Sequence, residues 1–249
     1  TYMEIVYKGT MRIDGKPRMP GVELNGRHIS FGDTVEGYAF LFVRWRNLLV
    51  GACCACVSAG WQEIDQAGFI FGKLVLIDNE LFLCRSLNVG KKEGDPNEWD
   101  DILDELGEDD SIWHWDEQGF FGQEREMNVE GHLIPVLRGK ASARTYIDEQ
   151  QVLCSAVLGG LGFRPVLEPY GTPCPIAETL VGQKINLFIG NGLIAGTLKD
   201  FNDYDLTLNV LLDSSPDIDS AWMIVSDNGD VIIDRSQIRR SCLVKEGLG

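Results

Sequence analysis

Twenty-eight glycines and nine prolines divide this 249-residue chain into segments too short for long helices. Turn dipeptides stand at Asp14-Gly15, Asn25-Gly26, Asp78-Asn79, Asn191-Gly192 and Asn228-Gly229. Between such signals the chain alternates apolar and polar residues or runs apolar, as strands do. Asn-Gly and Asp-Gly favour tight hairpins. The sequence therefore predicts a chain rich in short strands.

The first two thirds of the chain are predicted to combine strands with two short helices. The expected strands are Glu4 to Ile13, Arg27 to Phe31, Ala39 to Trp45, a hairpin from Gly68 to Arg85, and a closing strand from Gly162 to Glu168. A short helix from Trp61 ends at Gly68. Pro96 and Asn97 open a second, amphipathic helix. The residues between Trp115 and Val136 are expected to be irregular.

A proline-rich stretch from Glu168 to Pro175 is typical of a linker. The strands expected beyond it are Lys184 to Ile189, Leu193 to Phe201, Asp205 to Leu212, Trp222 to Ser226 and Val231 to Leu243. Short strands without a long helix favour a small closed barrel, because closure removes exposed strand edges.

The chain carries a net charge of −16, and this charge is concentrated in one segment. Between Lys91 and Glu130 lie fifteen of the 38 acidic residues but only three of the 22 basic ones. General binding to nucleic acid is disfavoured, since a polyanion would be repelled. The acidic segment is interpreted as a solvated helix and loop, with a cation site or a surface for a basic partner as alternatives.

Cysteine and histidine give no catalytic or metal-binding pattern. The seven cysteines are an odd number, three of them crowded into Cys53-Cys54-Ala55-Cys56, and His28, His114 and His132 lie at no zinc-ligand spacing. We expect free, mostly buried thiols, no metal and no cofactor.

Seven short motifs follow one another between Trp61 and Glu168. They are Gly68-Phe-Ile-Phe-Gly-Lys73, Leu83-Cys-Arg-Ser-Leu87, Pro96-Asn-Glu-Trp-Asp100, Trp113-His-Trp115, Phe121-Gly-Gln-Glu124, Arg138-Gly139 with Ser142-Ala-Arg144, and Gly162-Phe-Arg-Pro-Val-Leu-Glu168. In this order they resemble the C-type-lectin-like domains related to the formylglycine-generating-enzyme fold. Such domains occur in bacterial and phage proteins, including variable proteins diversified by retroelements. The C-terminal part resembles an Sm-like or SH3-like small barrel through Gly192 to Phe201 and Leu206 to Asn209.

The resemblance implies an α+β fold with four parts. A β-rich N-terminal segment (1–50) packs on, or belongs to, a C-type-lectin-like domain with little regular secondary structure (51–170). A linker (171–178) leads to a small five-stranded β-barrel (179–249). We expect Trp99, Trp113 and Trp115 to pin the lectin-like scaffold. Arg164 is expected to fix a neighbouring carboxylate or backbone carbonyls.

In diversified members of this family, the stretch before the Gly-Phe-Arg-type strand contacts the ligand. The residues of that stretch with interface-type side chains are Phe120, Phe121, Gln123, Arg125, His132, Arg138, Lys140, Ser142, Arg144 and Tyr146. Ordinary loop and core positions are the alternative interpretation. The calcium-lectin motifs are incomplete, with Asp95-Pro96-Asn97 alone, and the reactive cysteine pair of the formylglycine-generating enzymes is missing, since Cys154 has no second cysteine beside it.

The sequence thus predicts a non-enzymatic binding or display protein of phage or prophage origin. Its expected partner is a protein or glycan on a cell surface, with an oligomer or virion assembly formed through the barrel. Alternatives are a structural part of a phage-like particle, an enzyme using Asp100 and Asp104 as acid and base, and RNA binding at Arg235, Arg239 and Arg240. We expect no membrane span, no secretory signal and synthesis in a bacterial cytoplasm, with incorporation into a virion as a further option.

Overall fold

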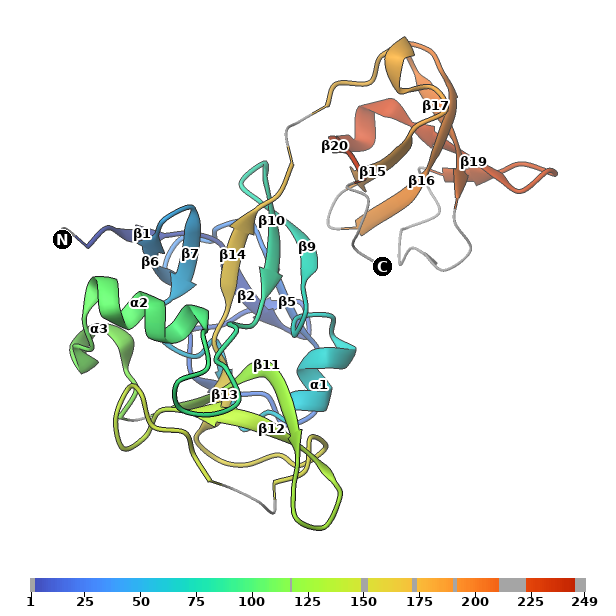
Figure 1. Cartoon of the computed structure of the whole chain (residues 1–249). Helices are drawn as coiled ribbons and strands as arrows, with labels where there is room; N and C mark the ends of the chain where they lie inside the picture. The colour runs from blue at the N-terminus through green and yellow to red at the C-terminus, as the bar shows by residue number, and fades with distance from the viewer. Residues whose placement is uncertain are drawn as a thin grey trace. The chain divides into compact units, whose positions relative to one another are not determined.

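The computed structural model describes residues 3–116, 118–148, 152–171, 174–189, 192–210 and 223–244. The chain divides into two compact units, Thr1–Tyr170 (unit 1) and Gly171–Gly249 (unit 2), and Figure 1 labels helices and strands of unit 1 and strands of unit 2. Of the described residues, 43% lie in strands and 11% in helices. The protein is therefore mostly β. The predicted α+β class, with a lectin-like part short of regular structure, is wrong.

The first sheet of unit 1 joins the two ends of the unit. Its strands are β1 (Ile5–Tyr7), β6 (Leu41–Trp45), β7 (Leu48–Gly51), β14 (Val166–Pro169), β10 (Glu80–Arg85) and β9 (Lys73–Ile77), in that order across the sheet. The closing strand β14 lies between β7 and β10 and pairs antiparallel with both. Because β1 pairs with β6, the N-terminal strands are part of the same framework.

The second sheet contains the hairpin that the sequence analysis missed. Its strands are β12 (Leu133–Arg138), β11 (Gly119–Met127), β13 (Leu161–Phe163), β8 (Cys56–Val57) and β4 (Val22–Glu23), in spatial order. Residues 119–138 are therefore mostly strand, not irregular. A register shift between Phe121 and Arg125 breaks the alternating pattern that would have revealed β11. Pro135 is accommodated because β12 is an edge strand.

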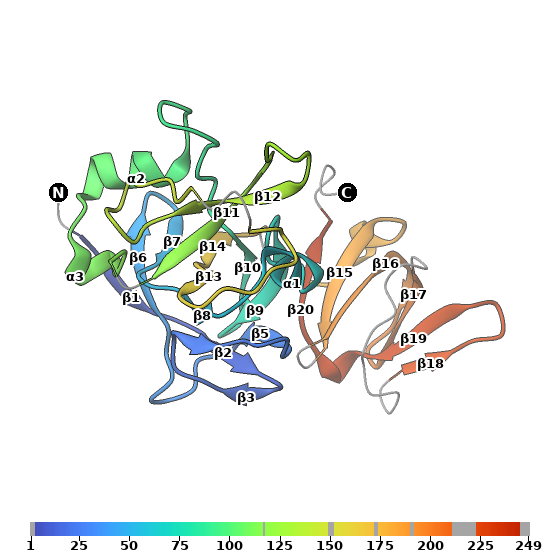
Figure 2. The ribbon, with the colours of Figure 1, turned by 90° about the horizontal axis from the view of Figure 1, so that it is seen from below.

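A small third sheet and three short helices complete unit 1. The sheet has the order β3 (Lys16–Pro17), β2 (Thr10–Ile13), β5 (Ile29–Gly32), and Figure 2 shows it on the opposite side of the unit from α2 and β12. The α-helices are α1 (Trp61–Gln66), α2 (Glu98–Leu106) and α3 (Asp110–Trp113). None of the helices in the described part of the chain has the length and apolar character that a membrane-spanning helix needs.

Helix α2 confirms the predicted amphipathic helix. The Asn97 side chain accepts a hydrogen bond from the Asp100 amide at 2.8 Å and caps the first turn. Trp99, Ile102 and Leu103 are buried, whereas the acidic residues lie on the other face. Acidic residues in the first turn also stabilise the helix, because they interact favourably with the positive end of its dipole.

The three tryptophans and Arg164 meet in one core, as the sequence predicts. The Trp99 ring packs edge-on against Trp113, with ring centroids 5.4 Å apart, and Trp115 packs against the same cluster. The Arg164 guanidinium is fully buried and donates to the carbonyls of Gly51, Ala52 and Trp113 at 2.8, 2.8 and 2.6 Å. The predicted contact of Arg164 with backbone carbonyls is therefore confirmed.

Gly162, two residues before Arg164, allows two strands to approach closely. A Cβ atom at Gly162 would lie 2.1 Å from the Cys56 carbonyl oxygen, a distance that no side chain tolerates. Gly162 pairs with Val57 in β8, and Phe163 packs against Phe69 with centroids 5.7 Å apart. The Gly-Phe-Arg motif is thus explained by packing.

Unit 2 is a single antiparallel sheet of six described strands. They are β18 (Met223–Val225), β19 (Asp230–Asp234), β17 (Asp205–Val210), β16 (Gly192–Phe201), β15 (Lys184–Ile189) and β20 (Ile238–Leu243), in spatial order. The prediction of five strands is one too few, because the 3-10 turn Arg235–Gln237 splits the expected last strand into β19 and β20. Some predicted features fall outside the described residues. They include part of the linker, Asn191 of the first predicted turn in unit 2, and Trp222.

We expect Arg164→Met to lower the free energy of unfolding of unit 1 by about 3–5 kcal/mol, because three buried carbonyls lose their donor. Urea unfolding of the full chain, followed by tryptophan fluorescence, measures this loss. Arg44→Ala is the matched control, since it removes only the exposed pair with Glu4 and costs about 1 kcal/mol or less. Equal losses in the two variants would show that Arg164 does not organise the core.

Candidate functional site

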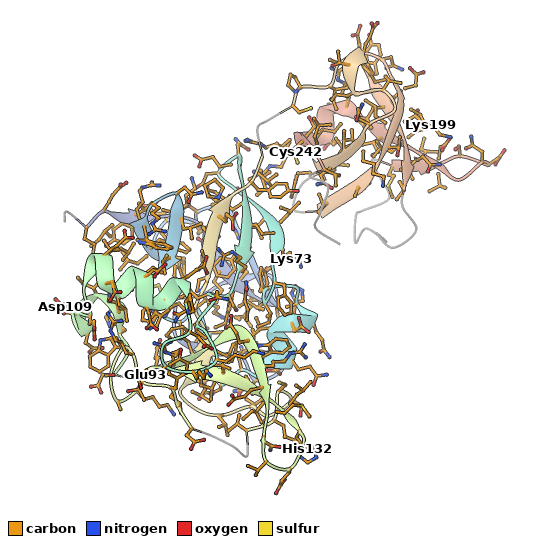
Figure 3. All side chains as sticks on the ribbon, in the orientation of Figure 1. Lys73, Glu93, Asp109, His132, Lys199 and Cys242 are labelled. Atoms are coloured by element: carbon orange, nitrogen blue, oxygen red, sulfur yellow. The ribbon has the colours of Figure 1, made fainter. Side chains whose placement is uncertain are left out.

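A groove of about 920 Å³ opens in unit 1 beside the start of α2. The groove is lined by residues 91–97, 100, 101, 126, 134–138, 142 and 144–148. One wall is the loop before α2, where Figure 3 labels Glu93, and the other is strand β12 with the segment that follows it. A hollow of this size is typical of a ligand-binding site.

The base of the groove is a buried arginine with its own counter-ion. Arg138, at the end of β12, is fully buried. Its guanidinium donates to Asp100 Oδ1 at 2.5 Å and to the Val89 carbonyl at 2.8 Å. Charge-assisted bonds of this kind are strong and directional. They fix β12 to the loop before α2.

Tyr146 also connects the two walls of the groove. Its ring stacks on the Arg138 guanidinium, 4.0 Å from the ring centroid. Its hydroxyl lies 3.0 Å from the Val89 carbonyl and 2.9 Å from the Lys92 carbonyl. Burial raises the pKa of the Tyr146 hydroxyl, so this group stays a neutral donor at physiological pH.

Arg144 ties the rim of the groove to the outer face of α2. Its guanidinium donates to Glu108 Oε1 at 2.5 Å and to Asp104 Oδ1 at 2.7 Å. The bond with Glu108, followed by that with Asp104, raises the pKa of Arg144. Ser142 and Thr145 share a hydroxyl hydrogen bond of 2.9 Å in the same segment. The rim is therefore built from paired groups.

These contacts explain much of the acidic segment. Arginines from distant parts of unit 1 neutralise acids of α2: Arg85 binds Glu98 with two nitrogens at 2.8 and 2.7 Å, and Arg46 pairs with Glu105. Such pairs also offset the unfavourable acids near the C-terminal end of the helix. The acidic segment is thus partly an internal network and not only a solvated face.

A second, smaller hollow of about 370 Å³ lies at the β11–β12 hairpin. It is lined by Phe71, Lys91, Gln123, Glu124, Arg125 and Leu133, so Lys91 borders both hollows. Glu124 accepts a hydrogen bond from the Val89 amide at 3.0 Å, and burial raises the pKa of its carboxyl group. The hollow is shallower and more apolar than the groove.

The structure brings together six of the ten residues that the sequence proposes as a binding site. Arg138, Ser142, Arg144 and Tyr146 line the groove, and Gln123 and Arg125 line the smaller hollow. The other four lie elsewhere. Phe120 and Phe121 are buried in the two hydrophobic cores, His132 stands at the hairpin tip (Figure 3), and Lys140 lies in the turn after β12.

The sequence analysis missed the opposite wall of the groove. Asp95, Asn97 and Asp100 belong to the Asp-Pro-Asn motif and the helix it opens, and none of them is among the residues that the sequence proposes for ligand binding. Asn97 donates to the Asp95 carbonyl at 2.8 Å and to Asp100 Oδ2 at 2.7 Å. No sequence signal connects these residues to Arg138, because the link spans separate elements.

Metal and thiol chemistry have little support in the described parts of the chain. Those parts contain no group of three or more His, Cys, Asp or Glu side chains placed to hold a metal ion. Burial raises the pKa of the Cys54 thiol to about 12, and it also raises the pKa values of Cys56 and Cys84. A neutral buried thiol is a poor nucleophile.

Comparisons with known proteins leave the family open. Neither models of protein families, nor curated proteins, nor solved structures give a match to this chain. The C-type-lectin-like resemblance therefore rests on the sequence motifs alone. The function must be argued from the geometry of the two hollows.

We expect Asp100→Asn to lower the free energy of unfolding by about 2–3 kcal/mol, because buried Arg138 loses its counter-ion. The loss stays below that of a fully enclosed pair, since the Asp100 side chain is 25% exposed. Asp101→Asn is the matched control, since the exposed Asp101 has no side-chain partner among the described residues. Urea unfolding distinguishes the two, and equal stability would refute the role of the Arg138–Asp100 pair.

We also expect Cys54, Cys56 and Cys84 to resist a thiol reagent such as DTNB at pH 8 in the native protein. Burial keeps these thiols protonated and out of reach. Mass spectrometry after alkylation identifies the modified positions, with half-exposed Cys174 as the reactive reference. Rapid labelling of Cys54 would contradict the buried, inert assignment.

Proposed function

We propose that unit 1 is a non-enzymatic recognition module that binds a macromolecular surface partner in the groove. In this proposal it is a display domain of the C-type-lectin-like variable type that its motifs resemble. The observation that carries the proposal is the groove itself. Its polar side chains are held by bonds within the protein, so the surface presented to a partner is rigid before binding. Such preorganisation lowers the entropic cost of association.

The contacts of Asp100 and Asp104, the acid pair of the enzyme alternative, favour recognition over catalysis. Asp100 is bound to Arg138, and Asp104 is bound to Arg144 at 2.7 Å. Each carboxylate is thus already used in a contact with an arginine of the same unit. Their contacts are those of structural anchors.

The RNA-binding alternative is weakened by the contacts of its basic cluster. Arg235 donates to the Asn202 carbonyl at 2.6 Å and lies over the Phe201 ring, 5.5 Å from its centroid. Arg239 and Arg240 also have partners within the chain. A cluster engaged in this way offers few free charges for phosphates.

We expect Glu93→Arg to weaken binding of the partner by about tenfold, because it reverses a charge in the groove wall. The labelled full-length chain is applied to a glycan array and to an array of bacterial surface-protein ectodomains. Glu36→Arg is the matched control, since Glu36 is an exposed acid of the same unit outside the groove.

Retention of a ligand by the wild-type chain and by Glu36→Arg, with loss by Glu93→Arg, supports the proposal. Equal retention by all three proteins shows that the groove is not the binding site. Absence of any retained glycan or ectodomain counts against a surface partner of either class.

A further inference from the structure

The smaller hollow is built on a single buried tryptophan. Trp61 is 2% exposed, and its indole nitrogen donates to the Gly122 carbonyl at 3.0 Å. The Arg125 guanidinium stacks on this ring, 4.4 Å from its centroid. Phe71 packs edge-on against it, with centroids 6.0 Å apart. Trp61 thus holds an arginine and a phenylalanine in fixed positions at the surface.

Three exposed apolar side chains lie in this hollow or on the adjoining β11–β12 hairpin. Phe71 is 56% exposed, Met127 61% and Leu133 45%. Met127 and Leu133 are register partners on β11 and β12, so their side chains lie side by side on one face of the hairpin. Aromatic, methionine and arginine side chains are the types enriched at protein interfaces.

Among the described residues, no carboxylate pairs with the arginine in this hollow. Arg46 offers a direct comparison, because it stacks on Trp45 at 4.3 Å in the same way and pairs with Glu105. No hydrogen bond or ion pair of the described residues involves the Arg125 guanidinium, and Lys91 beside it has no ion pair there either. The nearby Glu124 is bound instead to the Val89 amide. The described residues therefore leave this guanidinium oriented and without an ion-pair partner.

We propose that the hollow is a second binding site, which takes an acidic and apolar segment of a partner protein. An Asp or Glu carboxylate of that segment binds the Arg125 guanidinium, and neighbouring Leu, Phe or Met side chains pack on Phe71, Met127 and Leu133. This site does not depend on the groove.

The surroundings select this chemistry over other anions. A guanidinium suits both carboxylates and phosphates, but Phe71 and Leu133 in the hollow, with Met127 beside Leu133 on the hairpin, favour apolar groups on the ligand. The net charge of −16 repels polyanions such as nucleic acids, whereas one or two carboxylates carry little repulsion. The apolar side chains also extend over more than one residue, which fits a peptide segment.

The test uses the full-length chain and an array of end-capped octapeptides. Each peptide carries one central Asp or Glu among Leu, Phe and Met, and each has a counterpart with Asn or Gln. We expect acidic peptides to be retained over their amide counterparts. Fluorescence polarisation of the best peptide should show about tenfold weaker binding for Arg125→Ala and for Phe71→Ala.

Arg46→Ala is the matched control, because it removes a stacked arginine that already has its carboxylate. Glu93→Arg should also bind the peptide normally, which separates this site from the groove. The proposal is overturned if no acidic peptide exceeds its amide counterpart. It is also overturned if Arg125→Ala binds as the wild type does, with both proteins showing the same thermal unfolding.

Discussion

The buried guanidinium of Arg164 is the contact on which the architecture of unit 1 depends. It reaches carbonyls at the end of β7 and at the end of α3, and it packs against the Trp99 and Phe120 rings, 5.1 and 4.6 Å from their centroids. Burial lowers the pKa of this group, because the core disfavours its charge. Carbonyl dipoles and aromatic faces compensate for the lost water. These segments must therefore assemble together.

The same helix that serves this core also builds the groove. Trp99 faces inward, and the next residue, Asp100, meets Arg138 across the groove. Asp104, one turn further along α2, and Glu108, just after the helix, bind Arg144. Core packing and groove geometry are thus coupled through α2. A change that tilts this helix would move both walls of the groove.

The sequence predicted local elements better than their assembly. The Asn97 cap and the apolar spacing of Trp99, Ile102 and Leu103 sufficed for α2, because these signals act within one turn. The β11–β12 hairpin was missed because its bulge disrupts the alternation. The groove could not be predicted in full, since the Arg138–Asp100 contact joins residues 38 positions apart and no local pattern encodes such a pair.

Charge pairing separates the framework of this protein from the surface proposed to bind a partner. Arg46 and Arg125 each stack on a tryptophan in the fold. Their ion pairs differ, because Glu105 pairs with Arg46, whereas no carboxylate of the described residues pairs with Arg125. An acidic protein has ample carboxylates to neutralise every arginine. An arginine held rigid beside exposed apolar side chains without one therefore indicates a surface that binds another molecule.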